Sequence, residues 1–139
     1  MGLWQYAKTY AAAGDVVNRE GLVVPTYFLH GHSIELSLKA FLRGAGFTLQ
    51  QLQQIGHDLN KALESAEAHG LRRFVEFSDA DAVVINLLTQ GYKDKELEYM
   101  VTGVKNLPRL DLLSSLSNRL VGSLESYCYD RIDVFPEAI

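Results

Sequence analysis

The chain of 139 residues has the size of one domain, since single hydrophobic cores serve about 100–200 residues. Its content of 47% hydrophobic and 22% charged residues excludes a disordered or low-complexity chain. A single cysteine excludes an internal disulfide framework and a multi-cysteine zinc site. The formal net charge of −4 gives no general attraction to nucleic acid or to an anionic membrane.

The N-terminal segment carries no secretory signal pattern, because polar residues interrupt its apolar stretches and no basic region precedes them. No apolar run approaches the roughly 18 residues that a membrane span needs. We therefore expect a cytoplasmic protein without membrane association, and the single Cys128 fits a reducing compartment. We expect one domain over residues 1–139, with about 129–139 as a loose tail.

Apolar residues recur every three or four positions from Leu3 to Val17, which predicts a first amphipathic helix. Pro25 suits the first turn of a second helix over about residues 26–44. Apolar side chains cover most of this second helix, so we expect it to lie at the centre of the fold. Its polar residues form two narrow stripes: His32, Glu35, Lys39 and Arg43 in one, and His30, Ser33 and Ser37 in the other.

The next segments also follow helical rules. Thr48 with Gln51 three positions later predicts a capping box for a short helix over residues 49–55. Asp58 is a good N-cap for a fourth helix that ends at Gly70. Residues 71–78 fit either a loop or a strand.

The last third of the chain contains two further predicted helices. Ser78 or Asp79 caps a fifth helix that ends near residue 91, and residues 92–107 read as a loop passing over the core. A final helix is predicted over about 108–127. The sequence therefore predicts an all-α helical bundle.

The histidines are the first candidates for chemistry. His30 and His32 are two positions apart on one helix, so they point in different directions and cannot share an ion. A metal site could form from His32, Glu35 and His57 if the second helix meets the segment around residue 57. The alternative, which we favour, is that they are hydrogen-bonded polar groups of the interior, with no metal and no cofactor.

Glu35 and Lys39 have the i, i+4 spacing of a helical ion pair, and on a mostly apolar helix this pair is expected to be buried. His57 and Asp58 are its natural partners. We expect Glu35, Lys39, His57 and Asp58 to form one buried polar cluster that serves packing rather than catalysis.

Two further features carry weaker signals. Cys128 lies near the end of a helix, where the helix dipole does not lower a thiol pKa, so we do not expect a nucleophile. Arg72 and Arg73, with Lys39 and Arg43, could form a small basic patch or be solvated individually. The phosphate-binding and nucleophile-elbow motifs are absent from the sequence.

Residues 27–43 read YFLHGHSIELSLKAFLR, and residues 56–63 read GHDLNKAL. This order resembles the HEPN superfamily, whose small domains carry a similar E-L-x-L-K-A-x-L helix followed by a H-D-L turn and helix. A weaker similarity continues to Tyr99, where Glu98 stands in place of the usual arginine. The resemblance implies an antiparallel up-and-down bundle of about five helices that forms a homodimer. It also implies a toxin–antitoxin, phage-defence or nucleotidyltransferase-associated setting.

Ribonucleases of this superfamily share an Arg-x(4–6)-His motif, in which His moves protons and Arg holds the scissile phosphate. No arginine of this chain has a histidine at that spacing, and no histidine follows His69. We therefore expect no catalytic residues and a module that binds a partner protein (an antitoxin or a nucleotidyltransferase-like protein), a nucleotide or RNA. Possible binding residues are His32, Arg43, Arg72 and Arg73. The alternative is a divergent metal-independent ribonuclease that uses His32 or His57 with Arg43 or Lys39.

Overall fold

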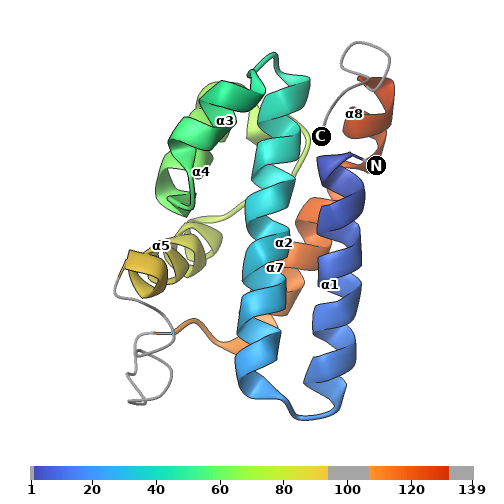
Figure 1. The fold of residues 1–139 in the computed structure, drawn as a ribbon, viewed down its shortest axis with the longest axis vertical. Helices are drawn as coiled ribbons and strands as arrows, with labels where there is room; N and C mark the ends of the chain where they lie inside the picture. Colours follow the sequence, from blue (N-terminus) through green and yellow to red (C-terminus); the bar gives the residue numbers. More distant parts are fainter. Residues whose placement is uncertain (1, 94–106, 132–139) are drawn as a thin grey trace.

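The computed structural model describes residues 2–93 and 107–131, and every regular element in these ranges is helical. The all-α prediction is therefore confirmed for this part of the chain (Figure 1). The helices are α1 (Leu3–Arg19), α2 (Val23–Gly44), α3 (Leu49–Ile55), α4 (Leu59–Ala68), the 3-10 turn η1 (Leu71–Arg73), α5 (Asp79–Lys93), α7 (Leu110–Ser123) and α8 (Glu125–Asp130).

Helices α1, α2 and α7 form the long layer of the molecule; α3 and α4 lie against α2, and α5 packs against α4 and α7 (Figure 1). Helix α1 is antiparallel to α2, but α7 runs in the same direction as α2. The Tyr27 hydroxyl, near the start of α2, donates to the Pro108 carbonyl, just before α7. Near the end of α2, the carbonyl of Phe41 accepts the Tyr127 hydroxyl at 2.8 Å.

After α2, the chain passes through α3, α4 and α5 and returns to the end of the bundle where α2 begins. Because α7 starts at that end, it runs parallel to α2. The expected up-and-down order therefore describes α1 and α2 but not α7. Small residues let α1 approach α2 closely, because Ala7 and Ala11 are buried and Ser33 Oγ donates to the Ala7 carbonyl at 2.7 Å. Trp4 joins α1 to α7 by donating its indole N–H to the Val121 carbonyl at 2.8 Å.

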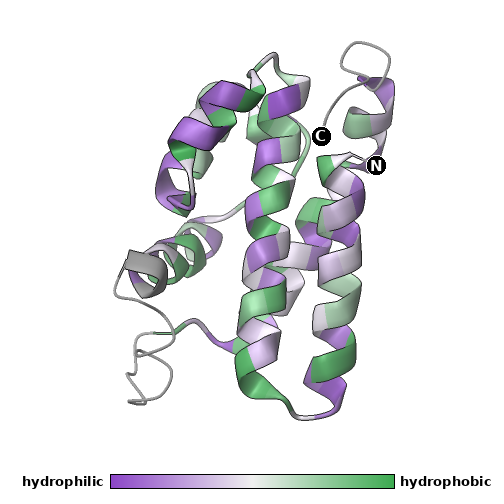
Figure 2. Cartoon of the chain, in the orientation of Figure 1, coloured by the Kyte–Doolittle hydropathy of each residue, from purple (hydrophilic) through white to green (hydrophobic). Residues whose placement is uncertain are grey.

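Helix α2 is the central element, as the apolar coverage predicts. Its side chains Ile34, Leu38, Phe41 and Leu42 are completely buried. The helix begins at Val23, three residues before the predicted start, and Pro25 lies within its first turn, where a missing N–H removes no helical bond. The side of α2 that faces the viewer in Figure 2 carries both hydrophobic and hydrophilic residues.

The caps of α3 and α4 are confirmed. Thr48 and Gln51 make both hydrogen bonds of a capping box at the start of α3. The Asp58 carboxylate accepts the Lys61 N–H at 3.0 Å and caps α4. Gly56 between the two helices has φ of +62°, a backbone conformation that side chains disfavour.

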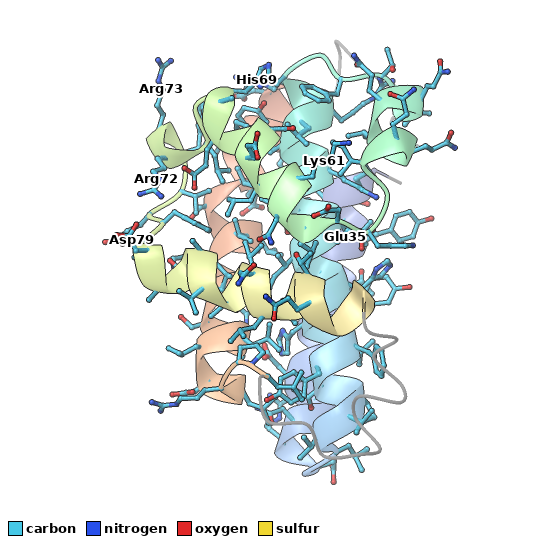
Figure 3. All side chains as sticks on the ribbon, turned by 90° about the vertical axis from the view of Figure 1, so that its left-hand side faces the viewer. Glu35, Lys61, His69, Arg72, Arg73 and Asp79 are labelled. Atoms are coloured by element: carbon cyan, nitrogen blue, oxygen red, sulfur yellow. The ribbon has the colours of Figure 1, made fainter. Side chains whose placement is uncertain are left out.

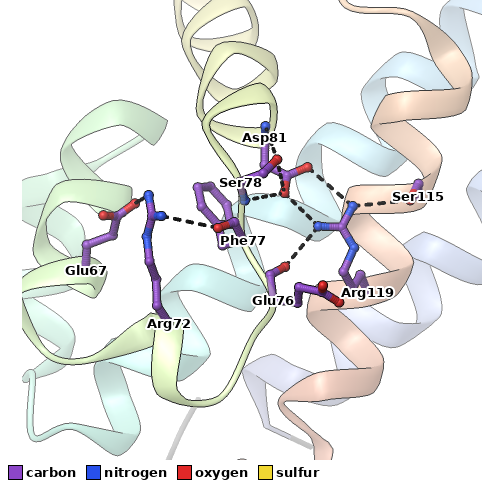
Figure 4. Close-up of polar contacts among 8 residues, drawn as sticks. All are labelled: Glu67, Arg72, Glu76, Phe77, Ser78, Asp81, Ser115 and Arg119. Atoms are coloured by element: carbon purple, nitrogen blue, oxygen red, sulfur yellow. Dashed lines mark hydrogen bonds and ion pairs between the residues drawn. The ribbon is translucent and has the colours of Figure 1, made fainter.

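Residues 71–78 contain no strand: η1 is followed by a turn at Phe74, a bend at Val75 and an irregular segment that leads into α5. Of the two predicted caps, Ser78 and Asp79, the structure shows Ser78 in this role: its Oγ accepts the Asp81 N–H at 3.3 Å, and α5 begins at Asp79. Arg119 of α7 fixes this junction, since Nη1 lies 2.7 Å from Asp81 Oδ2 and also donates to the Glu76 carbonyl (Figure 4).

The single final helix predicted over 108–127 is wrong, because α7 ends at Ser123 and α8 begins at Glu125. Leu124 between them has φ of −94° and ψ of 1°, and its side chain is fully buried. Gly122 just before the break lowers the helical tendency.

Helix α8 includes Tyr129 and Asp130, so it extends into the segment expected to be a loose tail. The predicted loop up to residue 107 falls largely within 94–106, and this segment, with Glu98 and Tyr99, lies outside the described residues, as do 132–139. None of the helices in the described ranges is long and apolar enough to cross a membrane.

Candidate functional site

The candidate site centres on Glu35, whose side chain is only 4% exposed on α2. Lys39 Nζ, one helical turn later, lies 3.0 Å from Glu35 Oε2. His57 Nδ1 lies 2.9 Å from Oε1 and 3.1 Å from Oε2 of the same carboxylate. We call these three residues the Glu35 cluster; it joins α2 to the turn between α3 and α4.

The members of the Glu35 cluster differ in burial. The Lys39 side chain is 13% exposed, whereas the His57 side chain is 77% exposed. The expectation of one wholly buried polar cluster is therefore wrong for His57. The site is a buried carboxylate neutralised by a nearly buried ammonium and covered by an exposed imidazole.

Asp58, the fourth residue of the predicted cluster, caps α4 directly after His57. As the half-buried N-cap of α4, it fixes where that helix begins and hence where the preceding His57 is placed. Figure 3 shows the start of α4 near Lys61 beside Glu35. The sequence correctly predicted that the H-D-L turn meets the Glu-x-x-x-Lys stripe.

The chemistry available at the Glu35 cluster follows from the orientation of His57. A carboxylate at Nδ1 holds the ring in one position and favours the tautomer with its proton on that nitrogen. The imidazole then presents Nε2 as its basic atom. Such a carboxylate–histidine pair is suited to proton transfer or to hydrogen bonding with a bound molecule.

His32 lies half-buried on the same face of α2, with its ring edge against Tyr10 at a centroid distance of 4.5 Å. Burial lowers the pKa of His32, the Glu35 carboxylate opposes this shift, and the charges of His57 and Lys39 reinforce it. The ring is therefore favoured in its neutral form. Within the described ranges, no group of three His, Cys, Asp or Glu side chains is arranged to hold a metal ion.

The predicted basic residues do not assemble around the Glu35 cluster. Figure 3 shows Arg72 and Arg73 together on η1, away from Glu35. Arg72 Nη2 lies 3.2 Å from Glu67 Oε1, and its other terminal nitrogen donates to a loop carbonyl (Figure 4). Arg43 lies in the last turn of α2 and donates to the Phe47 carbonyl at 2.9 Å, a position where a cation stabilises the helix end.

A second polar group, which sequence reasoning could not assemble, joins α1, α2 and α7. His30 of α2 is completely buried, and its Nδ1 is hydrogen-bonded with Ser117 Oγ of α7. Its Nε2 lies 3.2 Å from Asp15 Oδ1 of α1. The sequence correctly placed His30 in the interior, but its partners are 15 and 87 residues away, and no local pattern links these positions.

Comparisons with known proteins found no relative of this chain. No protein-family model, curated protein or solved structure matches the chain. The remaining candidate, Cys128, is half-buried, and burial raises the pKa of its thiol to about 12 despite the opposing charge of Arg131. This thiol stays protonated at neutral pH, as its position near a helix end predicts.

Proposed function

We propose that the chain is a non-catalytic, HEPN-like helical module that acts as a cytoplasmic homodimer and binds a partner protein, a nucleotide or RNA. The setting that we propose is a toxin–antitoxin, defence or nucleotidyltransferase-associated system. The resemblance of residues 27–43 and 56–63 supports this proposal, together with the all-α fold.

The Glu35 cluster supports a structural role for the residues that carry the resemblance. Glu35 is buried and contacts Lys39 and His57 through its two oxygens, so the carboxylate is occupied by groups of its own chain. A buried charge left without partners is strongly destabilising. The cluster therefore serves to hold the start of α4 against α2.

The observation that supports the homodimer is the exposed apolar turn between α1 and α2. Leu22, Val23 and Val24 are adjacent and 50%, 51% and 39% exposed, and Val16 on the neighbouring turn of α1 is 49% exposed. Figure 2 shows this hydrophobic end of the helix pair. Adjacent exposed apolar side chains are typical of protein–protein contact surfaces. We assign this end to the contact with a second copy of the chain.

The oligomeric state tests this assignment. Analytical ultracentrifugation should show a dimer for the wild-type chain and a monomer for Leu22→Asp. Leu22 is the N-cap of α2, where Asp is a favoured residue, so this variant should fold. Leu49→Asp is the matched control, since Leu49 on α3 is 40% exposed and distant from this turn. A dimeric Leu22→Asp variant or a monomeric wild type would overturn the proposal.

The absence of catalysis is tested separately. Purified protein incubated with RNA without added metal should leave the RNA intact. Cleavage that a single substitution abolishes would show an enzyme instead.

A second candidate function is a divergent metal-independent ribonuclease, and one observation favours it. The exposed His57 is held at Nδ1 by a buried carboxylate, with the Lys39 ammonium bound to the same group. In this reading His57 transfers the proton and Lys39 stabilises the phosphate charge. His57→Ala should then abolish cleavage, and His69→Ala, an exposed histidine after α4, should not. The candidate fails if His57→Ala and Lys39→Ala lower only the melting temperature.

A further inference from the structure

The buried ring of His30 meets polar groups from two other helices. From α1 it faces the Asp15 carboxylate, whose side chain is 34% exposed. From α7 it faces the Ser117 hydroxyl, which also lies 3.2 Å from the Ser114 carbonyl. Ser114 Oγ and the Asn118 amide donate to Asp15 and hold this carboxylate in place. These are the titratable and hydrogen-bonding groups that face His30 from the helices packed against it.

The neutral ring has one favoured arrangement. A lone pair on Nε2 would face the Asp15 carboxylate at 3.2 Å, so the proton of the neutral imidazole belongs on Nε2. Nδ1 then accepts the Ser117 hydroxyl hydrogen. The Nε2–H is not aligned with the Asp15 oxygen, so it gains no well-formed hydrogen bond.

The protonated ring requires a different arrangement. Both ring nitrogens then donate, so the Ser117 hydroxyl can no longer donate to Nδ1 and must turn away. Its new acceptor is already in place, because the Ser114 carbonyl lies within hydrogen-bonding distance. The contact between Nε2 and Asp15 becomes an ion pair, which does not depend on alignment as strictly as a neutral hydrogen bond does.

We propose that protonation of His30 switches the polar contacts that link α2 to α1 and α7. Uptake of one proton on Nδ1 turns the Ser117 hydroxyl from His30 to the Ser114 carbonyl and converts the His30–Asp15 contact into an ion pair.

The His30 ring is packed closely against α1. A Cβ atom at Gly14 would lie 2.7 Å from His30 Cδ2 and Nε2, so the backbone of α1 lies directly against the imidazole. Burial lowers the pKa of His30, and the charge of the Asp15 carboxylate only partly offsets this effect. The His30 side chain is therefore neutral at pH 7 and takes up its proton in acid.

The test is an NMR titration of the full chain labelled at histidine and at the Ser114 carbonyl. In the neutral form the proton should be on Nε2, and the midpoint should lie below the ordinary value of about 6.5. The Ser114 carbonyl signal should shift with the same midpoint, because it reports the turned hydroxyl. In Ser117→Ala that carbonyl shift should disappear.

Asp15→Asn provides an independent variant that should fold, since Asp15 lies near the surface. Loss of the carboxylate should lower the His30 midpoint by about one pH unit or more. Asp111→Asn on α7 is the matched control and should leave it unchanged, because Asp111 is exposed and pairs with Arg109. A neutral ring protonated on Nδ1, a Ser114 signal insensitive to the titration, or a midpoint unchanged in Asp15→Asn would each overturn the proposal.

Discussion

His57 Nδ1 lies 2.9 Å from Glu35 Oε1, although the two residues are 22 positions apart in the chain. This contact attaches the surface turn before α4 to the middle of the central helix. The same carboxylate is bound by Lys39, so one buried charge organises two segments. Its partners differ greatly in burial, and this difference makes the contribution of each measurable.

Replacing Glu35 by Ala should destabilise the protein much more than replacing His57. Glu35→Ala leaves the nearly buried Lys39 ammonium without its carboxylate, and we expect a loss of about 3 kcal/mol in the free energy of unfolding. His57→Ala removes a 77% exposed partner and should cost under about 1 kcal/mol. Urea denaturation of the two variants measures both values. Equal stability of Glu35→Ala and wild type would contradict the structural role of the cluster.

Two glycine substitutions should have opposite effects. Gly14→Ala places a Cβ atom 2.7 Å from the buried His30 ring and should destabilise the fold by about 1–3 kcal/mol. Gly122→Ala in α7 meets no atom within 4 Å and should stabilise it by about 0.5–1 kcal/mol. Thermal unfolding of both variants gives the comparison. Similar shifts for the two would show that α1 is not held close to His30.

Asp81 should make stability depend on pH in the acid range. Burial acts to raise the pKa of Asp81, but the hydrogen bond from Arg119, those from Ser78 and the charge of Arg119 outweigh it and lower the pKa. A lowered pKa means that the folded state favours the carboxylate. The stabilisation is complete above the unfolded value of about 4 and is lost as the pH falls through the folded value.

Asp81→Asn should therefore cost about 1–3 kcal/mol at pH 7, and the difference from wild type should shrink below about pH 4. Unfolding free energies measured by urea from pH 7 to pH 3 test this. Asp111→Asn is the control, since its pair with Arg109 is 62% and 76% exposed and contributes little. A constant difference across this pH range would assign the effect to packing instead.

The capping box at the start of α3 should contribute separately from the core. Thr48→Ala removes the side-chain acceptor of the Gln51 N–H and should cost about 1 kcal/mol. Thr9→Ala serves as the comparison, because Thr9 lies exposed inside α1 and its hydroxyl only bonds back to the Gln5 carbonyl. That change should be neutral or slightly stabilising, since Ala favours helix interiors. Equal losses for both would contradict the capping role.

Local chemistry predicted most helix boundaries. The Thr48–Gln51 box and the Asp58 cap define α3 and α4 because each depends on residues within one helical turn. The parallel direction of α7 and the break at Leu124 could not be predicted in the same way. Both depend on how distant segments pack: the first on the path through residues 45–109, the second on burial of Leu124 and on the contact of Tyr127 with Phe41.

The candidate site, too, was only partly predictable from the sequence. Glu35 and Lys39 are predictable as a pair from their spacing, and the sequence pattern also pointed to His57. The exposure of His57 was not predictable, because it depends on where the turn lies relative to the surface. The partners of His30 could not be found either, since Asp15 and Ser117 come from two other helices and are 102 positions apart in the numbering.

The shared direction of α2 and α7 has a consequence for the order of folding. Helices α1 and α2 are neighbours in the chain and need only a short turn to meet, whereas α7 meets α2 only after a loop of more than sixty residues has closed. Closing a longer loop carries a larger entropic penalty, and contacts distant in the chain form more slowly. We therefore expect the α1–α2 hairpin to form early in folding and α7 to dock onto it later.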